Sequence, residues 1–152
     1  MELPAPRASR FWHRALPAMY AVIGFLDPLI RREWRSTGIG LGNVVELRVA
    51  GRRTGQYRSV LLTLLREGEQ WFLGHPNGDV AWTLNLEAAG TADLKFPRTV
   101  PIPVRARRLE GAERDVPMGL FDQHPFPGNL VYRAARAHIR AVGVYFALDR
   151  VA

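Results

Sequence analysis

The sequence predicts a mainly β domain with helices (α+β), built as a small closed or split barrel of six mostly antiparallel strands. Six short segments carry strand patterns, and helical segments lie before and between them. The first three strands follow one another through tight turns, which leaves no room for the crossover helices that parallel pairing needs. With 152 residues, of which 47% are hydrophobic, the chain can bury one core, so we expect a single domain over 1–152.

The N-terminal segment 1–36 is expected to be helical. Seven apolar side chains recur there at helical spacing: Phe11, Trp12, Leu16, Met19, Tyr20, Ile23 and Leu26. The apolar stretch 15–26 has 12 residues, which is too short to span a bilayer. Two interpretations stay open: the segment packs on the domain, or residues 7–30 lie on an anionic membrane surface with their arginines at the headgroups.

The strand pattern begins after the Gly-rich segment 37–42. Val45, Leu47 and Val49 alternate with polar residues, which predicts a half-buried strand over 44–49. After a turn, the nearly continuous apolar run of 57–65 predicts a second strand in a central position. A third strand is expected over 70–74, after a turn at Gly68.

A helix is predicted over 81–89, because Gly90 stands where a helix stop belongs. The fourth strand is expected over 91–96 and the fifth over 100–109. Pro101 and Pro103 place the start of the fifth strand at a sheet edge, since proline cannot donate to a strand ladder. The remaining predicted elements are helices over 110–123 and 129–140 and a sixth strand over 142–148.

The segment 51–58 is the strongest candidate for a binding site. It places Arg52, Arg53, Thr54 and Arg58 within one predicted hairpin turn. Its two glycines allow positive φ angles and a close approach of the backbone to a ligand, and such turns form anion-binding nests. Arginine adds forked donors for phosphate oxygens. The alternative is a solvated basic hairpin.

A second candidate is the segment 74–79, a predicted loop that opens the helix 81–89. Backbone N–H groups at a helix start have no intrahelical partner, so they can bind a ligand. His75 can act as a hydrogen-bond donor or an acid, although a loop histidine is also a common structural residue. Trp82 is a candidate ligand wall or core residue, and Asp79 is expected to be the N-cap.

Composition excludes several kinds of chemistry. The chain has no cysteine, which rules out disulfides, thiolate nucleophiles and Cys-based metal sites. Its four histidines are scattered, so no metal site is predicted, and no Walker-type loop or nucleophile elbow is present. The formal net charge of +7 comes almost entirely from arginine, and lysine occurs only at position 95. Arginine suits phosphate and carboxylate, so the charge indicates an anionic partner.

Two motifs together resemble the deazaflavin-dependent nitroreductase family. The first is the run Gly-Arg-Arg-Thr-Gly-Gln at 51–56 with Arg58, and the second is Trp82-x-x-Asn85-Leu86. The resemblance covers about 44–109 and is looser over the closing strand. It implies a small split β-barrel, related to the flavin-reductase and pyridoxamine-phosphate-oxidase barrels, that binds the deazaflavin coenzyme F420.

The resemblance also implies which residues bind this coenzyme. It assigns the basic turn to the cofactor phosphate and polyglutamate tail, the following loop to the deazaflavin ring, and two helix residues to the pocket wall. The residues assigned to the phosphate and tail are Arg52, Arg53, Thr54, Gly55 and Arg58. Those assigned to the ring are His75, Pro76, Asn77 and Gly78, and those assigned to the pocket wall are Trp82 and Asn85.

The catalytic residues are less well defined by this resemblance. The loop between Gly74 and Trp82 is shorter than in many relatives, and Thr63 stands where one relative has an aromatic residue. Tyr132 and Phe126 are candidate replacements for the family's substrate-flanking tyrosines. The catalytic candidates are therefore His75 and Tyr132.

The expected function is an oxidoreductase that uses F420H2 as a hydride donor to a small, planar, apolar acceptor such as a quinone, nitroaromatic or activated alkene. A barrel that binds FMN or heme is the first alternative. A further alternative is a non-catalytic basic barrel on nucleic acid or a lipid surface, although the arginines cluster in turns and helices and nucleic acid is not expected. We expect a cytoplasmic protein, with membrane association and a homodimer as open alternatives.

Overall fold

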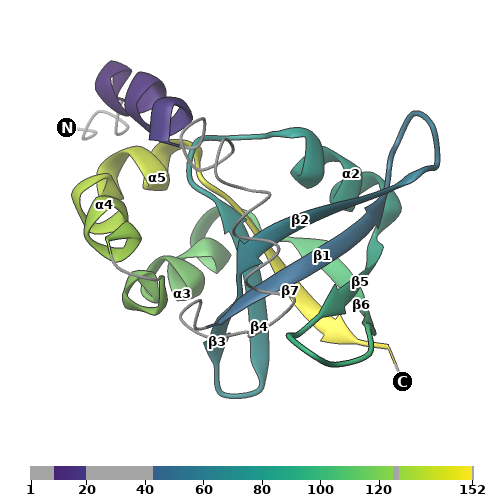
Figure 1. Ribbon diagram of the computed structural model, residues 1–152. Helices are drawn as coiled ribbons and strands as arrows, with labels where there is room; N and C mark the ends of the chain where they lie inside the picture. The colour runs from purple at the N-terminus through teal and green to yellow at the C-terminus, as the bar shows by residue number, and fades with distance from the viewer. Residues whose placement is uncertain (1–8, 20–42, 125–126, 152) are drawn as a thin grey trace.

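The computed structural model describes residues 9–19, 43–124 and 127–151, and these form a curled sheet with helices on one side and at one end (Figure 1). Residues 10–19 form an N-terminal helix. The strands are β1 (Val44–Ala50), β2 (Tyr57–Thr63), β3 (Leu65–Glu67), β4 (Gln70–His75), β5 (Thr91–Lys95), β6 (Ile102–Arg108) and β7 (Val144–Arg150). The α-helices are α2 (Ala81–Ala89), α3 (Asp115–Met118), α4 (Gly128–Ala134) and α5 (Arg136–Val142).

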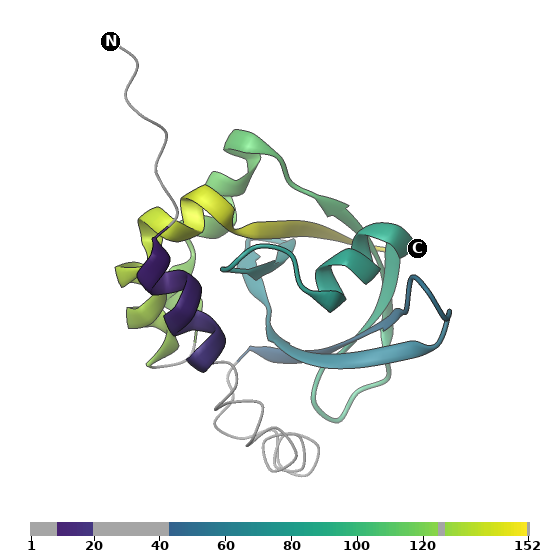
Figure 2. The ribbon, with the colours of Figure 1, turned by 90° about the horizontal axis from the view of Figure 1, so that it is seen from above.

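The seven strands form one antiparallel sheet in the order β2-β1-β5-β6-β7-β4-β3. The two edge strands, β2 and β3, are separated in the sequence only by Leu64. Two edges joined by a single residue cannot lie far apart, so the sheet curls around its core, as Figure 2 shows from above. The predicted α+β class and antiparallel barrel are confirmed.

One core fills the inside of the curled sheet. Alternate residues of β1, β4, β5 and β7 point inward, as the period of two requires, and Leu86 of α2 packs against them. The buried members are Val45, Leu47, Val49, Leu64, Trp71, Leu73, Leu86, Ala92, Leu94, Val104, Val144, Phe146 and Leu148. Because α2 contacts β1, β5 and β6, it covers one end of the barrel.

A second core lies on the opposite face of β3, β4 and β7, beneath the C-terminal helices. It contains the outward-facing Phe72, Tyr145 and Ala147 together with residues of α3, α4 and α5. The N-terminal helix packs here as well, since Trp12 contacts this cluster and Leu16 is fully buried. Both ribbon views place that helix beside α4 and α5.

The outer face of the N-terminal helix carries Arg10, Phe11 and Arg14, all exposed. The rest of the predicted helical segment, 1–8 and 20–36, lies outside the described residues, as does Phe126. None of the helices that the structure describes has the length and apolarity needed to cross a membrane.

The predicted second strand, 57–65, is wrong in two respects. It divides at Leu64 into β2 and β3, which gives seven strands instead of six. The backbone of Leu64 leaves both ladders and pairs with Asn43: its N–H donates to the Asn43 carbonyl (2.9 Å), and its carbonyl accepts from Asn43 Nδ2 (2.6 Å). β2 is also an edge strand of the sheet and not a central one. Its apolar run is continuous because Val60 and Leu62 face the inner core while Leu61 is half-buried on the other face.

The C-terminal boundaries differ as well. The helix predicted over 129–140 is two helices that meet at Ala135, and 110–123 contains only the short α3 between 3-10 turns at Gly111–Arg114 and Phe121–Gln123. The last strand begins at Val144 instead of 142, because Val142 ends α5 and the Gly143 N–H still donates to the Ile139 carbonyl (2.6 Å).

The fifth predicted strand is β6, and its Pro-containing start behaves partly as expected. Ile102 and Pro103 pair in a ladder with β5 alone, and the ladder with β7 begins at Val104. Val104 and Arg105 pair with both neighbours, and residues 106–108 pair with β7 alone, so β6 lies between β5 and β7 although their ladders overlap only at its centre.

Candidate functional site

The two motifs singled out in the sequence meet at one end of the barrel. The turn after β1 lies against α2, where the backbone N–H of Arg52 donates to Asn85 Oδ1 (3.1 Å) and the Arg52 guanidinium donates to the same oxygen (2.9 Å). Asn85 is 7% exposed, so this oxygen is held in a buried position on the helix. The Asn85 side chain therefore fixes the basic turn to α2, although 33 positions separate the two residues.

The turn itself is closed by its own backbone. The Gly51 N–H donates to the Gln56 carbonyl (2.8 Å), and the Gly55 N–H donates to the Gly51 carbonyl (2.8 Å). Gly55 adopts φ +71°, a left-handed conformation that costs glycine little. Among the described residues, no hydrogen-bond acceptor is found for the N–H groups of Arg53 and Thr54. The exposed tip thus has donors available for an anion.

Arg58 belongs to the same end of the barrel. It pairs with Val49 across β1 and β2, and strand alternation places it on the face shared by Val60 and Leu62, which is the inner face. Tyr57 lies on the outer face, with the Arg48 guanidinium 4.6 Å from its ring centre. Arg53 and Arg58 are both exposed and form no ion pair with any residue in the described ranges, so their charges remain available to a ligand.

The predicted loop begins one residue later than expected, because His75 is still the last residue of β4. Its Nδ1 lies 3.0 Å from the Gly78 carbonyl oxygen and 3.3 Å from the Asn77 nitrogen. The tautomer with a proton on Nδ1 donates to Gly78, and the other tautomer accepts from Asn77. Burial lowers the pKa of His75, against the opposing effects of the Gly78 carbonyl and Asp79, so His75 is neutral at pH 7.

Gly74 is required by a close approach inside the sheet. It pairs directly with Tyr145 of β7, and a Cβ at position 74 would lie 2.4 Å from the Tyr145 ring. From the sequence, Gly74 was predicted as the last residue of the third strand and the first residue of the candidate segment 74–79. The tyrosine that occupies the space beside it is 71 positions away, so no local signal could reveal this role.

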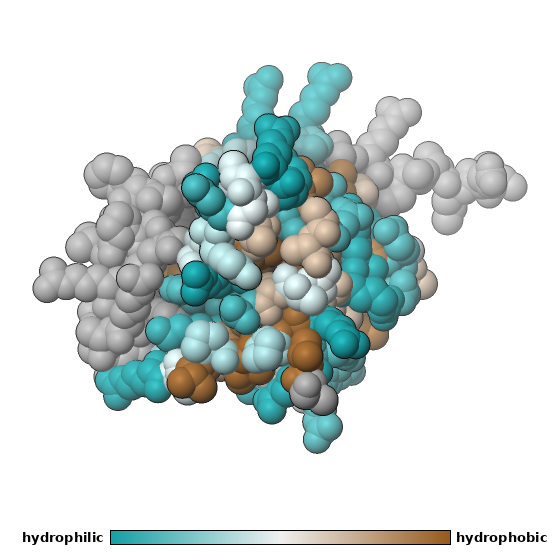
Figure 3. Space-filling model, turned by 90° about the vertical axis from the view of Figure 1, so that its right-hand side faces the viewer, coloured by the Kyte–Doolittle hydropathy of each residue, from teal (hydrophilic) through white to brown (hydrophobic). Residues whose placement is uncertain are grey.

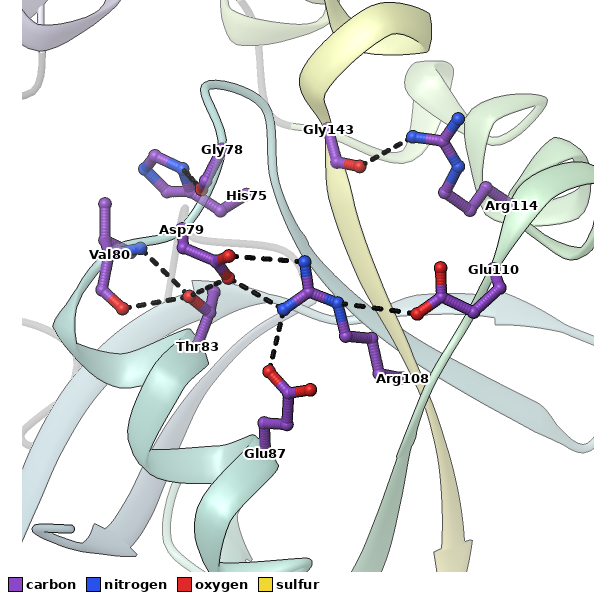
Figure 4. Close-up of polar contacts among 10 residues, drawn as sticks. All are labelled: His75, Gly78, Asp79, Val80, Thr83, Glu87, Arg108, Glu110, Arg114 and Gly143. Carbon is purple, nitrogen blue, oxygen red and sulfur yellow. Dashed lines mark hydrogen bonds and ion pairs between the residues drawn. The ribbon is translucent and has the colours of Figure 1, made fainter.

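The start of α2 is held by a network that sequence reasoning missed (Figure 4). Val80 is the N-cap, in place of the predicted Asp79, and its N–H donates to Thr83 Oγ1 (2.9 Å). The Thr83 hydroxyl lies 3.0 Å from Asp79 Oδ1, to which Arg108 of β6 also donates (2.9 Å). The hydrogen bond from Arg108 lowers the pKa of Asp79.

Arg108 binds the helix in a second place. It donates to Glu87 Oε2 (2.8 Å), one residue beyond Leu86 of the inner core. Arg108 therefore connects β6 to both the loop before α2 and the last turns of α2. Its three carboxylate neighbours, which include Glu110 at 3.9 Å, are charge partners that the sequence scatters over 32 positions.

The other predicted residues divide into two groups. Trp82 is half-buried, with its ring 6.2 Å from that of Phe146 in the inner core, so it lies at the covered end of the barrel with the basic turn and the loop. Tyr132 lies in the second core, stacked on Phe121 at 5.9 Å and close to His124 at 4.0 Å between ring centres. The sheet separates Tyr132 from the end where Arg52 contacts Asn85 on α2.

The surface around the β1–β2 turn is mostly hydrophilic. Figure 3 views the right-hand side of Figure 1, where the β1–β2 turn projects, and hydrophilic residues cover most of its described part, with apolar residues in small separate patches. At this end the exposed Arg53 and Arg58 form no ion pair with any described residue.

Comparison with solved structures identifies the architecture. An F420-H2 dependent reductase is 22% identical, with a TM-score of 0.54 over 69% of this chain and 93% of that one. The chain has the split-barrel fold. A pyridoxamine 5'-phosphate oxidase-related, FMN-binding protein from Nostoc punctiforme superposes with a TM-score of 0.52 at 11% identity, over 82% of this chain and 80% of its own.

A domain-swapped dimer is similarly close to this split barrel: 20% identical, with a TM-score of 0.55 over 88% of this chain and 99% of the other. No protein-family model and no curated protein matches the sequence. At these identities the comparisons show the fold, and the chemistry of the site has to be argued from its own residues.

Proposed function

We propose that this split barrel is an oxidoreductase that binds the deazaflavin coenzyme F420 at the end of the barrel covered by α2. The hydrogen bonds from Arg52 to Asn85 carry this proposal, because they bring the basic turn to the helix that bears Trp82. The resemblance of both motifs to deazaflavin-dependent nitroreductases and the likeness to an F420-H2 dependent reductase support the choice of cofactor.

The residues present fit such a group. Its phosphodiester and carboxylates are anionic, and the turn offers the N–H groups of Arg53 and Thr54 with the guanidinium groups of Arg53 and Arg58. When bound, the reduced cofactor supplies a hydride to the acceptor. The protein holds the anionic part at the turn, and Trp82 with the loop 75–78 would form the wall at the ring.

Among the described residues at this end, His75 is the candidate acid or base, which agrees with a reaction whose chemistry the cofactor supplies. A neutral His75 provides a hydrogen bond but no positive charge, so its role would be to orient a polar group or the loop. The acceptor we propose is small, planar and apolar, a quinone, nitroaromatic or activated alkene, because such a molecule could stack on the ring within reach of the hydride. The proton that completes its reduction would come from the reduced cofactor or from water. Tyr132 would need the second core to open before it could take part.

FMN and heme are the alternative cofactors. FMN carries a single terminal phosphate that the same turn could hold, so only a binding measurement separates it from F420. Heme requires an axial ligand, and both ring nitrogens of the buried His138 already form hydrogen bonds, to Ser9 and Asn77. A heme bound through His138 would break both contacts.

The test is a fluorescence titration of the purified protein with F420 and with FMN, together with a search for a Soret band on heme reconstitution. We expect saturable F420 binding. Arg53→Glu and Arg58→Glu should each weaken it by about tenfold or more, since each replaces an attractive charge with a repulsive one. Arg105→Glu makes the same charge change on exposed β6 and should leave the affinity unchanged. Absence of F420 binding, or equal loss in all three variants, would overturn the proposal.

A further inference from the structure

Side-chain contacts to three elements hold the loop between β4 and α2, and one of them reaches outside the site. His75 binds the Gly78 carbonyl, and Asp79 binds Arg108. The third contact joins Asn77 Oδ1 to Nε2 of His138, on α5, at 2.8 Å. His138 in turn accepts a hydrogen bond at Nδ1 from the backbone N–H of Ser9 (3.1 Å). Ser9 precedes the N-terminal helix, so His138 lies between that helix and the loop.

We propose that His138 is a positioning residue that couples docking of the N-terminal helix to the conformation of the loop at Asn77. The coupling itself depends only on the contacts just described. Its consequence for cofactor affinity rests on the proposed function, because the loop 75–78 is the part assigned to the deazaflavin ring.

The two contacts determine the tautomer of His138. Ser9 N–H is a donor, so Nδ1 must be the unprotonated nitrogen, and the proton of a neutral ring is then on Nε2. Nε2–H donates to Asn77 Oδ1, an acceptor. Each contact thus favours the tautomer that the other one needs, and loss of the Ser9 contact removes the constraint that directs the proton toward Asn77.

Because His138 is buried, losing either of its hydrogen bonds should cost free energy. His138 is 1% exposed, so a ring nitrogen that loses its protein partner gains no full compensation from water. The ring also contacts His13 of the N-terminal helix edge-to-face, with ring centres 4.7 Å apart. Ser9 and His13 of the N-terminal segment and Asn77 of the loop therefore meet on one imidazole.

Protonation of His138 would break its contact with Ser9. A doubly protonated ring has no acceptor at Nδ1, so the Ser9 N–H would face another donor. Among the described residues that contact the ring, His13 is titratable, whereas Asn77 and the Ser9 backbone are neutral. Burial and the neighbouring His13 both lower the pKa of His138, which keeps the ring neutral at pH 7.

Two substitutions of Ser9 distinguish its backbone N–H contact with His138 from the helix cap formed by its side chain. Ser9 Oγ also accepts from the Trp12 N–H (3.4 Å), so Ser9→Ala loses this cap but keeps the N–H donor to His138. Ser9→Pro loses both, at a position before the helix where proline is tolerated. The difference between the two variants isolates the N–H to Nδ1 contact.

Two substitutions at position 138 complete the series. In His138→Gln the side-chain amide can still donate to Asn77, while the acceptor at the Nδ1 position is lost. In His138→Phe both contacts are lost and the ring volume is kept. Arg14→Ala, on the exposed face of the same helix, is the control for nonspecific effects.

The first measurement is amide hydrogen exchange of the segment 76–80 in the protein without cofactor. Ser9→Pro and His138→Phe should raise its exchange rate about fivefold, the size of one net hydrogen bond, while Ser9→Ala and Arg14→Ala leave it unchanged. In the wild type the rate should also rise, relative to the intrinsic rate, as the pH falls through the pKa of His138. His75 contacts the same segment and also has a lowered pKa, so the rise should be smaller in His138→Gln but not absent. An equal rise in both proteins would contradict the coupling.

Two further readouts keep the inference falsifiable. A long-range proton–nitrogen spectrum should show His138 as the Nε2–H tautomer at pH 7, and the Nδ1–H tautomer would overturn the proposal. It is also overturned if folded Ser9→Pro and His138→Phe proteins keep wild-type exchange in 76–80. In the variants whose segment 76–80 exchanges faster, the affinity for F420 should also be lower. Exchange that responds in a protein that binds no F420 would uphold the coupling and refute the proposed cofactor.

Discussion

At the residue scale, side chains of this protein are defined by neighbours that are far away in the sequence. Arg52 is held by Asn85, Gly74 has the Tyr145 ring beside it, and His138 joins Ser9 to Asn77. These contacts divide the arginines of the basic turn by role. Arg52 donates its backbone N–H and one guanidinium N–H to Asn85, which holds the turn against α2, whereas Arg53 and Arg58 are exposed and form no ion pair with described residues. A sequence motif alone cannot separate these two roles.

His124 provides a residue-scale prediction about pH. Burial against Phe121 and Tyr132 lowers its pKa from 6.5 to about 4. Between these values the unfolded chain binds a proton that the folded protein excludes, so the free energy of unfolding falls as the pH drops from 6.5 toward 4. The loss attributable to His124 is at most about 3 kcal/mol, at 1.36 kcal/mol per pH unit.

Urea denaturation of the wild type and His124→Phe at pH 7, 5.5 and 4.5 measures this effect. We expect the wild type to lose more stability than the variant over this range. His75 and His138 also have lowered pKa values, but they contribute equally to both proteins. Parallel pH profiles would show that His124 titrates normally in the folded state.

At the element scale, the N-terminal helix has two different faces. Trp12 and Leu16 pack on the domain, which supports the first of the two interpretations for residues 10–19. The outer face still carries Phe11, 66% exposed, between Arg10 and Arg14. An exposed aromatic ring flanked by arginines is also what a peripheral membrane contact requires, so packing and membrane contact can coexist on opposite faces of this helix.

The prediction for this helix concerns anionic vesicles. If the outer face contacts lipid, Arg10→Glu with Arg14→Glu should reduce co-sedimentation with phosphatidylglycerol vesicles by about tenfold or more, since each basic residue near such a surface contributes about 1 kcal/mol. Phosphatidylcholine vesicles should bind neither protein. Arg105→Glu, which changes the charge on the outer face of β6, is the matched control. Unchanged binding of the double variant would exclude this face as the contact.

At the scale of the whole molecule, closure of the sheet depends on the link between its two edges. Asn43 donates to the Leu64 carbonyl and accepts from its N–H, at the residue where β2 becomes β3. The outer edge of β3 is separately covered by the Gln123 side chain, which accepts from the Arg66 N–H (2.7 Å) and donates to its carbonyl (2.6 Å). Covering an edge in this way discourages pairing with another chain.

Asn43→Ala tests the closure. It removes the side-chain donor to Leu64, and we expect the free energy of unfolding to fall by about 1 kcal/mol, with faster amide exchange in both β2 and β3. Gln123→Ala removes a hydrogen-bonding amide at the exposed outer edge and should accelerate exchange only at Arg66 and its neighbours. If Asn43→Ala affects β1 and β2 alone, the two edges of the sheet are not coupled through Leu64.

A feature of this fold could be predicted from the sequence when the residues that determine it are close together along the chain. Helix α2 was predicted with its exact bounds, because Gly90 and the apolar pattern are local signals. The turn at 51–56 and the alternation of β1 were predicted for the same reason. The division at Leu64 was missed, because the apolar run is locally uniform and the break depends on hydrogen bonds to Asn43. The meeting of the basic turn with Trp82 and Asn85 was expected from the family resemblance, whereas Arg108 and His138 carried no signal in the sequence.

The sequence by itself determined the mainly β class, most strand and helix positions, and an Arg-rich turn suited to an anion, since periodicity, glycine and charge act over a few residues. Only the tertiary structure decided which strands form the edges, that Tyr132 lies in a different core from the basic turn, and that Arg108 and His138 hold the loop. The physical reason is that a buried polar group must find its partner wherever the fold places one, and those partners lie 29 and 61 positions away along the chain.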